Sequence, residues 1–238
     1  MNQLPDDPVV INSVTTKTVE LRRLLTAIAT DFAPAVFANS LGAEDMVLTD
    51  LIVREKLAIE IFSLDTGRLP GETYDLIGRL RRHYGLTLTL YYPQHELVEA
   101  YTRQHGINGF YESVELRKAC CHTRKVEPLQ RALAGKKAWV TGLRAEQATT
   151  RSGLALREFD ATNQLEKFNP LADWTEQEVW AYIRANDVPF NKLHDQGYPS
   201  IGCAPCTRAV AAGEHVRSGR WWWEDPTSKE CGLHVSRA

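Results

Sequence analysis

The sequence predicts an α/β fold in which helices pack on a mainly parallel β-sheet. Short apolar runs alternate with helical patterns through the first two-thirds of the chain, at the spacing of βαβ units. Several of these runs end at glycine-, serine- or aspartate-bearing segments, as loops after parallel strands often do. With 238 residues, of which 43% are hydrophobic, the chain is long enough to bury a full core.

Each expected element follows from its own pattern. Residues 35–38 and 57–64 are short apolar runs and predict two strands, with a helix between them that ends near residue 56. Residues 86–92 and 138–141 predict two further strands. Additional helices are expected at 72–84, 95–104 and 121–133, and from the segment 169–175 to about residue 186. No element is assigned before residue 35.

Composition and charge exclude several classes of protein. A net charge of −2 provides no basic field for nucleic acid. The chain has no uncharged apolar stretch long enough to predict a membrane span, and its first residues lack the regions of a secretory signal. We therefore expect a soluble cytoplasmic protein with no nucleic-acid or membrane partner, whose thiols are kept reduced.

The loop Ser40-Leu41-Gly42-Ala43-Glu44-Asp45 joins the first strand to a helix. Backbone N–H groups at such a helix start can hold an anion such as phosphate. The loop matches neither GxGxxG nor the Walker A sequence, which argues against a dinucleotide-binding or ordinary P-loop enzyme. Its two acids can equally well serve only to stabilise the helix dipole, so both interpretations stay open.

Two more strand ends carry candidate ligand contacts. Leu64-Asp65-Thr66-Gly67 supplies a carboxylate, a hydroxyl and an open backbone, which suit a nucleoside but also an ordinary turn. Gly142-Leu143-Arg144 offers a guanidinium to an anion. Ligands bind at the carboxyl ends of parallel strands, so these loops are expected to contribute to one site.

Four of the five cysteines form two close pairs, Cys120-Cys121 and Cys203-Ala204-Pro205-Cys206, and Cys231 stands apart. In a reducing compartment, clustered thiols indicate metal binding or catalysis more often than a disulfide framework. Four thiolates can hold a [4Fe–4S] cluster and leave one thiol as a nucleophile. Structural zinc is the main alternative, although adjacent cysteines are unusual in zinc sites. Redox disulfides and coincidence also stay open.

The order of these motifs is more informative than any one of them. The chain carries, in order, 40–45, 64–67, 118–125 around the cysteine pair, 142–147, the CxxC and a terminal Glu-Cys-Gly-Leu-His. This succession closely resembles the assimilatory adenylyl-sulfate and phosphoadenylyl-sulfate reductase family, over nearly the whole chain from Ser40 to His234. The four-cysteine set resembles that of members that bind a [4Fe–4S] cluster and use adenosine 5′-phosphosulfate.

The resemblance implies an adenine-nucleotide-binding, Rossmann-like fold related to the ATP pyrophosphatases. It also implies that Cys231 attacks the sulfate sulfur, expels AMP and becomes an S-sulfocysteine, from which thioredoxin or a similar thiol reductant releases sulfite. The cluster ligands that it implies are Cys120, Cys121, Cys203 and Cys206. The substrate contacts that it implies are Ser40, Leu41, Gly42, Glu44, Asp45, Leu64, Asp65, Thr66, Gly67, Lys125, Gly142, Arg144, Arg217, Arg220 and His234. Among these, Lys125 is expected to bridge the cluster and the sulfate.

The same resemblance suggests how the chain is organised. Residues 1–206 would form the reductase domain with its [4Fe–4S] site. Residues 207–238 would form a mobile C-terminal tail that carries the catalytic cysteine, with the tryptophans at 221–223 as a docking surface. We also expect a homo-oligomer.

Three alternatives remain at this point. The nearest is a phosphoadenylyl-sulfate reductase or a dual-specificity member of the same family. A nucleotidyl transferase of the ATP-pyrophosphatase type would need a Ser-Gly-Gly-x-Asp-Ser loop, whose second glycine and final serine are absent after Gly42. A zinc-stabilised nucleotide sensor would leave Cys231 without a role.

Overall fold

A six-stranded sheet forms the centre of the protein in a computed structural model, which describes residues 7–147, 153–211, 213–225, 229 and 232–233. The strand order is β3-β2-β1-β4-β6-β5. All neighbouring strands are parallel except β5, which runs antiparallel to β6 at one edge. The strands are β1 (Ala35–Ala38), β2 (Ile59–Leu64), β3 (Thr89–Tyr91), β4 (Ala138–Val140), β5 (Arg157–Asp160) and β6 (Leu165–Phe168).

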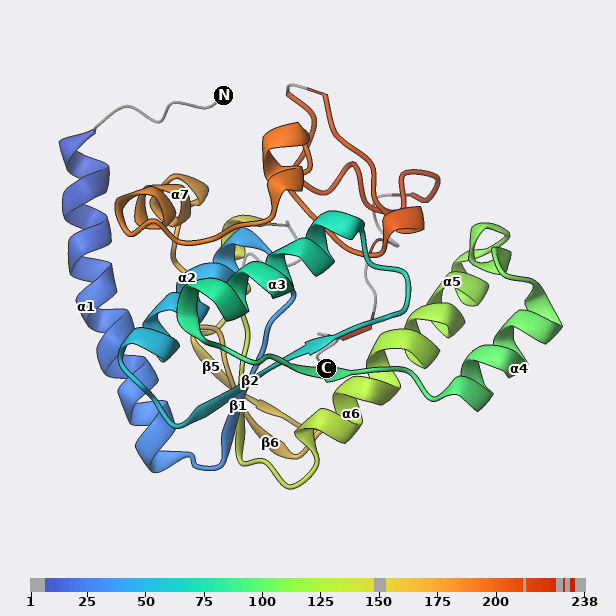
Figure 1. The fold of residues 1–238 in the computed structure, drawn as a ribbon, viewed down its shortest axis with the longest axis horizontal. Coiled ribbons are helices and arrows are strands. Elements are labelled where there is room, and N and C mark those ends of the chain that lie inside the picture. Colours follow the sequence, from blue (N-terminus) through green and yellow to red (C-terminus); the bar gives the residue numbers. More distant parts are fainter. Residues whose placement is uncertain (1–6, 148–152, 212, 226–228, 230–231, 234–238) are drawn as a thin grey trace.

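Seven α-helices are seen in the described part of the chain (Figure 1). They are α1 (Pro8–Asp31), α2 (Ala43–Arg54), α3 (Gly71–Tyr84), α4 (His95–His105), α5 (Val114–Cys121), α6 (Glu127–Leu133) and α7 (Glu176–Ala185). Figure 1 shows α4, α5 and α6 on the side of the sheet away from α1. None of the helices in the described ranges is long and apolar enough to cross a lipid bilayer.

Alternation along the strands produces a core on each face of the sheet. In β1, Ala35 and Phe37 pack into a large apolar cluster with α1, α2 and α7, whereas Val36 packs with α6 on the opposite face. Successive side chains of a strand point to opposite faces, so a short all-apolar run is buried on both. This confirms the predicted α/β fold with a largely parallel sheet.

Most expected elements are confirmed, with shorter strands, but the predicted helix at 121–133 is wrong in detail. The helix α5 ends at Cys121, a π-helical segment covers His122–Val126, and α6 follows. Pro128 has no N–H to donate to the carbonyl of Arg124, so an α-helical bond is missing at this point. Such segments are rare and often lie at functional sites, and apolar periodicity does not reveal them.

Three features of the structure were not predicted from the sequence: α1, α5 and the β5–β6 hairpin. The sequence does carry a signal for the start of α1, because an aspartate followed by a proline is typical of a helix N-terminus. In the structure, Asp7 accepts a 2.9 Å hydrogen bond from the Val9 N–H, and Pro8 occupies the first turn. The strands β5 and β6 have four residues each, too few for a clear period.

The order of the strands determines where a ligand can bind. From β1 the chain builds outward to β2 and β3 on one side and later places β4 on the other side. The carboxyl ends of β1 and β4 therefore flank the point where the direction of winding reverses. Open α/β sheets bind their ligands in the crevice at this point.

Candidate active site

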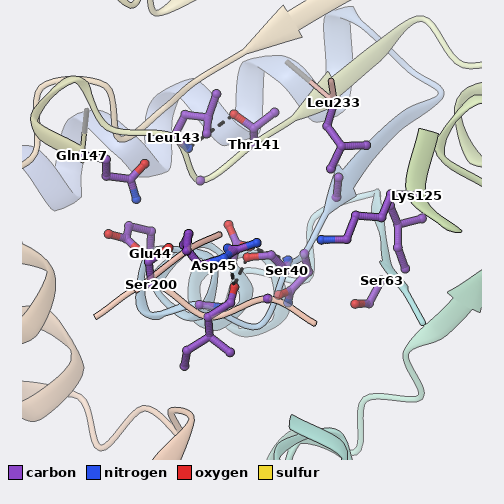
Figure 2. A pocket seen from close by; sticks show the side chains of 18 of the residues that line it. Ser40, Glu44, Asp45, Ser63, Lys125, Thr141, Leu143, Gln147, Ser200 and Leu233 are labelled. Atoms are coloured by element: carbon purple, nitrogen blue, oxygen red, sulfur yellow. Dashed lines mark hydrogen bonds between the residues drawn. The ribbon is translucent and has the colours of Figure 1, made fainter. Parts of the chain in front are cut away.

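A pocket of about 220 Å³ lies at this reversal point, and Figure 2 shows the side chains that point into it. Residues that directly follow β1, β2 and β4 form part of its lining, together with the segment 199–202 and part of the C-terminal region. The predicted substrate contacts that line it are Ser40, Gly42, Glu44, Asp45, Leu64, Thr66, Lys125, Gly142, Arg217 and Arg220. Residues as far apart in sequence as Ser40 and Arg220 thus meet where the strand order predicts a ligand site.

The loop before α2 is held by its own side chains. The Ser40 N–H donates to the carboxylate of Asp45, as the dashed lines in Figure 2 mark. The Leu41 N–H donates to Oδ1 of Asn39 at 2.6 Å. Leu41 has a φ of 65° and only 1% of its side chain is exposed, so it anchors the loop in the core instead of lining the pocket. The loop is therefore rigid before any ligand arrives.

Asp45 is a buried carboxyl in the wall of the pocket. Burial raises its pKa to about 7, against the effect of hydrogen bonds from Ser40 and the Gly142 backbone, and the charge of Glu44 raises it further. A Cβ at position 142 would lie 1.9 Å from an Asp45 oxygen. Only glycine fits there, because any side chain would displace the carboxyl.

Cationic groups line another part of the pocket. Lys125, Arg217 and Arg220 all reach it, and Figure 2 shows the Lys125 side chain extending into the space. The Arg220 guanidinium is 4.6 Å from the centre of the Trp221 ring and donates to the Ile201 carbonyl at 3.3 Å. A Cβ at Gly202 would lie 2.3 Å from this guanidinium, so glycine leaves the space it needs. These groups suit an anionic substrate.

All four paired cysteines line one smaller cavity beside this pocket. Its other lining residues are Arg68, Phe110, Arg117, Arg124, Lys125 and Pro205. Lys125 is thus shared, because it lines both the cysteine cavity and the larger pocket. The structure brings together two pairs of thiols that are more than 80 positions apart in sequence.

The loop of Cys203 and Cys206 is fixed by the segment after β2. The Ala204 N–H donates to the Arg68 carbonyl at 2.8 Å, and the Thr66 hydroxyl lies 3.2 Å from the Cys203 sulfur. Burial opposes ionisation of Cys203, but the charge of Lys125 and the Thr66 contact outweigh it and lower the pKa of the thiol. One of the four thiols is thus disposed to act as a thiolate ligand.

The four thiols around this cavity are a donor set for a metal site. A [4Fe–4S] cluster takes one thiolate on each of its four iron atoms, and four thiols line the cavity. The donor set therefore fits such a cluster. Zinc, which four thiolates also bind, stays an alternative.

The segment after Cys206 packs firmly on α5. Arg117, which is fully buried, forms two hydrogen bonds of 2.8 and 2.7 Å to the Glu224 carboxylate. The Trp221 ring lies between the guanidinium groups of Arg117 and Arg220, each 4.6 Å from its centre. Trp221 is 2% exposed, so the expectation that it belongs to a docking surface is wrong. A domain boundary at residue 206 stays a prediction.

Four of the predicted substrate contacts do not line the pocket. Leu41 is in the core, Asp65 accepts hydrogen bonds from the Gly67 N–H and the Tyr74 hydroxyl, and Gly67 forms the turn with a φ of 69°. Arg144 is buried and forms ion pairs with Glu44 at 2.9 Å and with Glu146 at 2.7 Å. Their role as substrate contacts stays a prediction. Cys231 and His234 lie outside the described residues, but Leu233 lines the pocket.

Some residues that line the pocket were not among the predicted substrate contacts. They include Asn39, Ser63, Thr141, Gln147, His194, Ser200 and Trp221. Ser63 and Thr141 lie at or just after strand ends and could have been found from the alternation of β2 and β4. His194, in a short 3₁₀ helix, reaches the pocket only through tertiary packing.

The comparisons with known proteins agree with this geometry. The chain is 62% identical over 211 residues to the adenosine 5′-phosphosulfate reductase of Allochromatium vinosum, covering 89% of this chain and 82% of the relative. It is 55% identical over 220 residues to the enzyme of that name from Burkholderia cepacia, covering 92% of this chain and 88% of the relative.

Two solved structures are similar to this chain in fold. A phosphoadenylyl-sulfate reductase from Candida auris superposes with a TM-score of 0.68 at 30% identity, over 87% of this chain and 98% of that one. An FMN adenylyltransferase from Candida glabrata shares the fold alone, with a TM-score of 0.60 at 15% identity, over 90% and 70% of the two chains. Residues 34–209 match the phosphoadenosine phosphosulfate reductase domain, and the chain belongs to that family.

Proposed function

We propose that this protein reduces adenosine 5′-phosphosulfate to sulfite and AMP, with a thiol reductant, in assimilatory sulfate reduction. The observation that carries the proposal is the position of Lys125, which lines both the nucleotide-sized pocket and the cavity of four cysteines. Relatives at 62% and 55% identity bear the name of this activity. The cationic side chains that line the pocket suit the phosphosulfate.

The chemistry requires one thiol that is not a ligand. In the proposed reaction, the Cys231 thiolate attacks the sulfur of the sulfo group, and the bond from that sulfur to the phosphate oxygen breaks. AMP leaves, and Cys231 carries an S-sulfo group. A thiolate of thioredoxin or a similar reductant then attacks the Cys231 sulfur, so that sulfite departs and a mixed disulfide forms. A second thiol of the reductant resolves this disulfide and restores Cys231.

The cationic side chains reduce the barrier to the first step. A thiolate approaching an anionic sulfo group meets repulsion, which fixed positive charges offset in the transition state. Lys125, Arg217 and Arg220 are the groups placed for this role. Cys120, Cys121, Cys203 and Cys206 would hold a [4Fe–4S] cluster, which would supply a non-redox element beside the sulfate when it is bound.

A second candidate function is the reduction of 3′-phosphoadenosine 5′-phosphosulfate, alone or alongside the unphosphorylated substrate. The observation in its favour is the superposition with a phosphoadenylyl-sulfate reductase at 30% identity. The unphosphorylated substrate is favoured by the four-cysteine set, which resembles that of family members that use adenosine 5′-phosphosulfate. Initial rates with the two nucleotides, measured separately on one preparation, decide between them.

The direct test uses protein purified without oxygen. Incubation with adenosine 5′-phosphosulfate and reduced thioredoxin should release sulfite and AMP in equal amounts. Without thioredoxin, the protein should release at most one equivalent of AMP and no sulfite. Iron and acid-labile sulfide should both be present. A preparation with full iron content that releases neither product would overturn the proposal.

A substitution of Lys125 tests whether the residue that lines both cavities contributes to the reaction. Lys125→Ala should lower kcat/KM by roughly 100-fold, the scale of losing one charge contact in a transition state. Iron content should stay unchanged, because lysine is not a ligand. Lys118→Ala is the matched control, since Lys118 is exposed on α5 and lines neither cavity. Near-normal kinetics for Lys125→Ala would show that its charge does not act on the sulfate.

A further inference from the structure

A buried ion pair joins α5 to the segment after Cys206. The Nε and Nη2 atoms of Arg117 donate hydrogen bonds of 2.8 and 2.7 Å to the two carboxylate oxygens of Glu224. The two side chains are 1% and 3% exposed. A buried pair adds little stability beyond that of apolar side chains of the same size, but its paired hydrogen bonds fix a geometry. This pair therefore contributes mainly by holding α5 and the later segment in one arrangement.

The ring of Trp221 packs directly on this ion pair. The Arg117 guanidinium lies 4.6 Å from the centre of the ring, and the Arg220 guanidinium lies at the same distance from it. The carboxylate of Glu224 offsets the charge of Arg117, so two guanidinium groups can share one indole without the repulsion of two uncompensated cations. Trp221 thus connects the buried pair with Arg220, which lines the larger pocket.

The backbone of Trp221 has a conformation that tryptophan rarely adopts. Its φ is 41°, in the left-handed region, where the Cβ of a bulky residue crowds the backbone. The Trp221 N–H donates to the Cys206 carbonyl at 3.2 Å, and its carbonyl accepts the Glu224 N–H at 2.9 Å. Strained backbone persists only where its neighbours hold it, and it clusters at functional sites. The residue directly before this strained position is Arg220.

Arg220 is prepared to bind an anion. It is 7% exposed, and its guanidinium donates to the Ile201 carbonyl at 3.3 Å. In the described part of the chain, its buried Nε has no hydrogen-bond partner. A buried guanidinium with an unused donor is disposed to bind an anionic ligand. Its position depends on its contact with Trp221 and on the space that Gly202 leaves for it.

We propose that the ion pair of Arg117 and Glu224 positions Arg220 for the anionic end of the nucleotide, and that Trp221 transmits this constraint. Neither member of the pair has to touch the nucleotide, because Glu224 lines neither cavity and Arg117 lines only the cysteine cavity. The inference rests on the proposed function for the identity of the nucleotide, but it concerns binding and not turnover. Arg117 and Glu224 are thus positioning residues.

The test is a double-mutant cycle between Glu224→Gln and Arg220→Ala. Calorimetry measures the binding of adenosine 5′-phosphosulfate to the full chain carrying Cys231→Ser, so that the bound nucleotide is not consumed. Glu224→Gln removes the charge and keeps the shape, and it should weaken binding roughly tenfold, the order of a misplaced charge-assisted hydrogen bond. In protein that already carries Arg220→Ala, the same substitution should change binding by less than about twofold, because residues that act through one contact are not additive.

Further measurements separate positioning from damage to the fold. Thermal melting shows whether each variant is folded, and the iron content of Glu224→Gln should match that of its parent because Glu224 does not line the cysteine cavity. The matched control is Glu214→Gln in the same segment. The Glu214 carboxylate lies 3.7 Å from Arg208, is 36% exposed and lines neither cavity. Nucleotide binding to this control should stay within about twofold of the parent.

A second variant keeps the test decisive if Glu224→Gln does not fold. Arg117→Lys retains the charge of the pair but loses the planar group that packs on Trp221, so it should weaken binding in the parent and not in the Arg220→Ala background. Equal losses in both backgrounds, or no loss in either, would overturn the inference. A wild type that binds the nucleotide but releases no sulfite contradicts only the proposed function, and the cycle still decides the inference.

Discussion

Cys231→Ser is expected to abolish sulfite release while leaving the iron content and nucleotide binding of the wild type. Cys231 is the one cysteine outside the two close pairs, so its loss removes no ligand from the cavity. A serine hydroxyl does not ionise at neutral pH, and an O-sulfo serine could not be released by thiol exchange. The loss should reach the detection limit of the assay. Iron analysis, AMP binding and sulfite release on one preparation measure all three properties.

The wild-type protein provides the complementary result. Mixing it with adenosine 5′-phosphosulfate in the absence of thioredoxin should add about 80 Da, the mass of SO₃, through a covalent bond to the nucleophile. Addition of reduced thioredoxin should remove this mass. Peptide mapping that locates the adduct on one of the paired cysteines, or a complete absence of the adduct, would show that the nucleophile is assigned wrongly.

Cys203→Ser is expected to remove the cluster and with it most of the activity. Cys203 is buried, its sulfur lies 3.2 Å from the Thr66 hydroxyl, and its loop is tied to β2 through the Arg68 carbonyl. Serine is a poor iron ligand compared with a thiolate, so iron should fall from about four atoms per chain to near zero. We expect kcat to fall at least 100-fold, the effect of losing an electrostatic contribution to the transition state.

Cys231→Ser is the matched control, because it makes the same cysteine-to-serine exchange and leaves both close pairs of cysteines intact. Thermal melting should separate the two variants. Only Cys203→Ser should melt earlier, since a bound cluster links α5 to the loop of Cys203 and Cys206 and stabilises the folded state. Wild-type iron content in Cys203→Ser would exclude Cys203 as a ligand.

The sheet was predictable to the extent that its strands were long or uniformly apolar. The run Ala35–Ala38 is buried on both faces of the sheet and was placed correctly. The hairpin of β5 and β6 was not, because its edge strand Arg157–Asp160 has one apolar residue in four positions and therefore shows no apolar period. The π-helical segment after Cys121 follows from a missing donor at Pro128 and its packing, neither of which a hydrophobic period encodes.

The pocket was predictable where a motif follows a strand directly. Ser40 and Thr66 come after β1 and β2, and both line the pocket. Arg144 also follows a strand, yet its guanidinium forms ion pairs with the carboxylates of Glu44 and Glu146. One of these, Glu44, is 100 positions away in sequence. Sequence order indicates which loops meet at a sheet edge, but not which charges neutralise one another there.

The sequence by itself indicated the chemistry proposed for this protein, because the two close pairs of cysteines and the separate fifth cysteine are visible without a fold. It also determined the family, through motifs in a fixed order. Only the tertiary structure decided that Lys125 lines both cavities and that Asp45 occupies the donors of its own loop. These outcomes depend on burial and on partners from distant segments, which set the direction, the hydrogen bonds and the ionisation of each side chain.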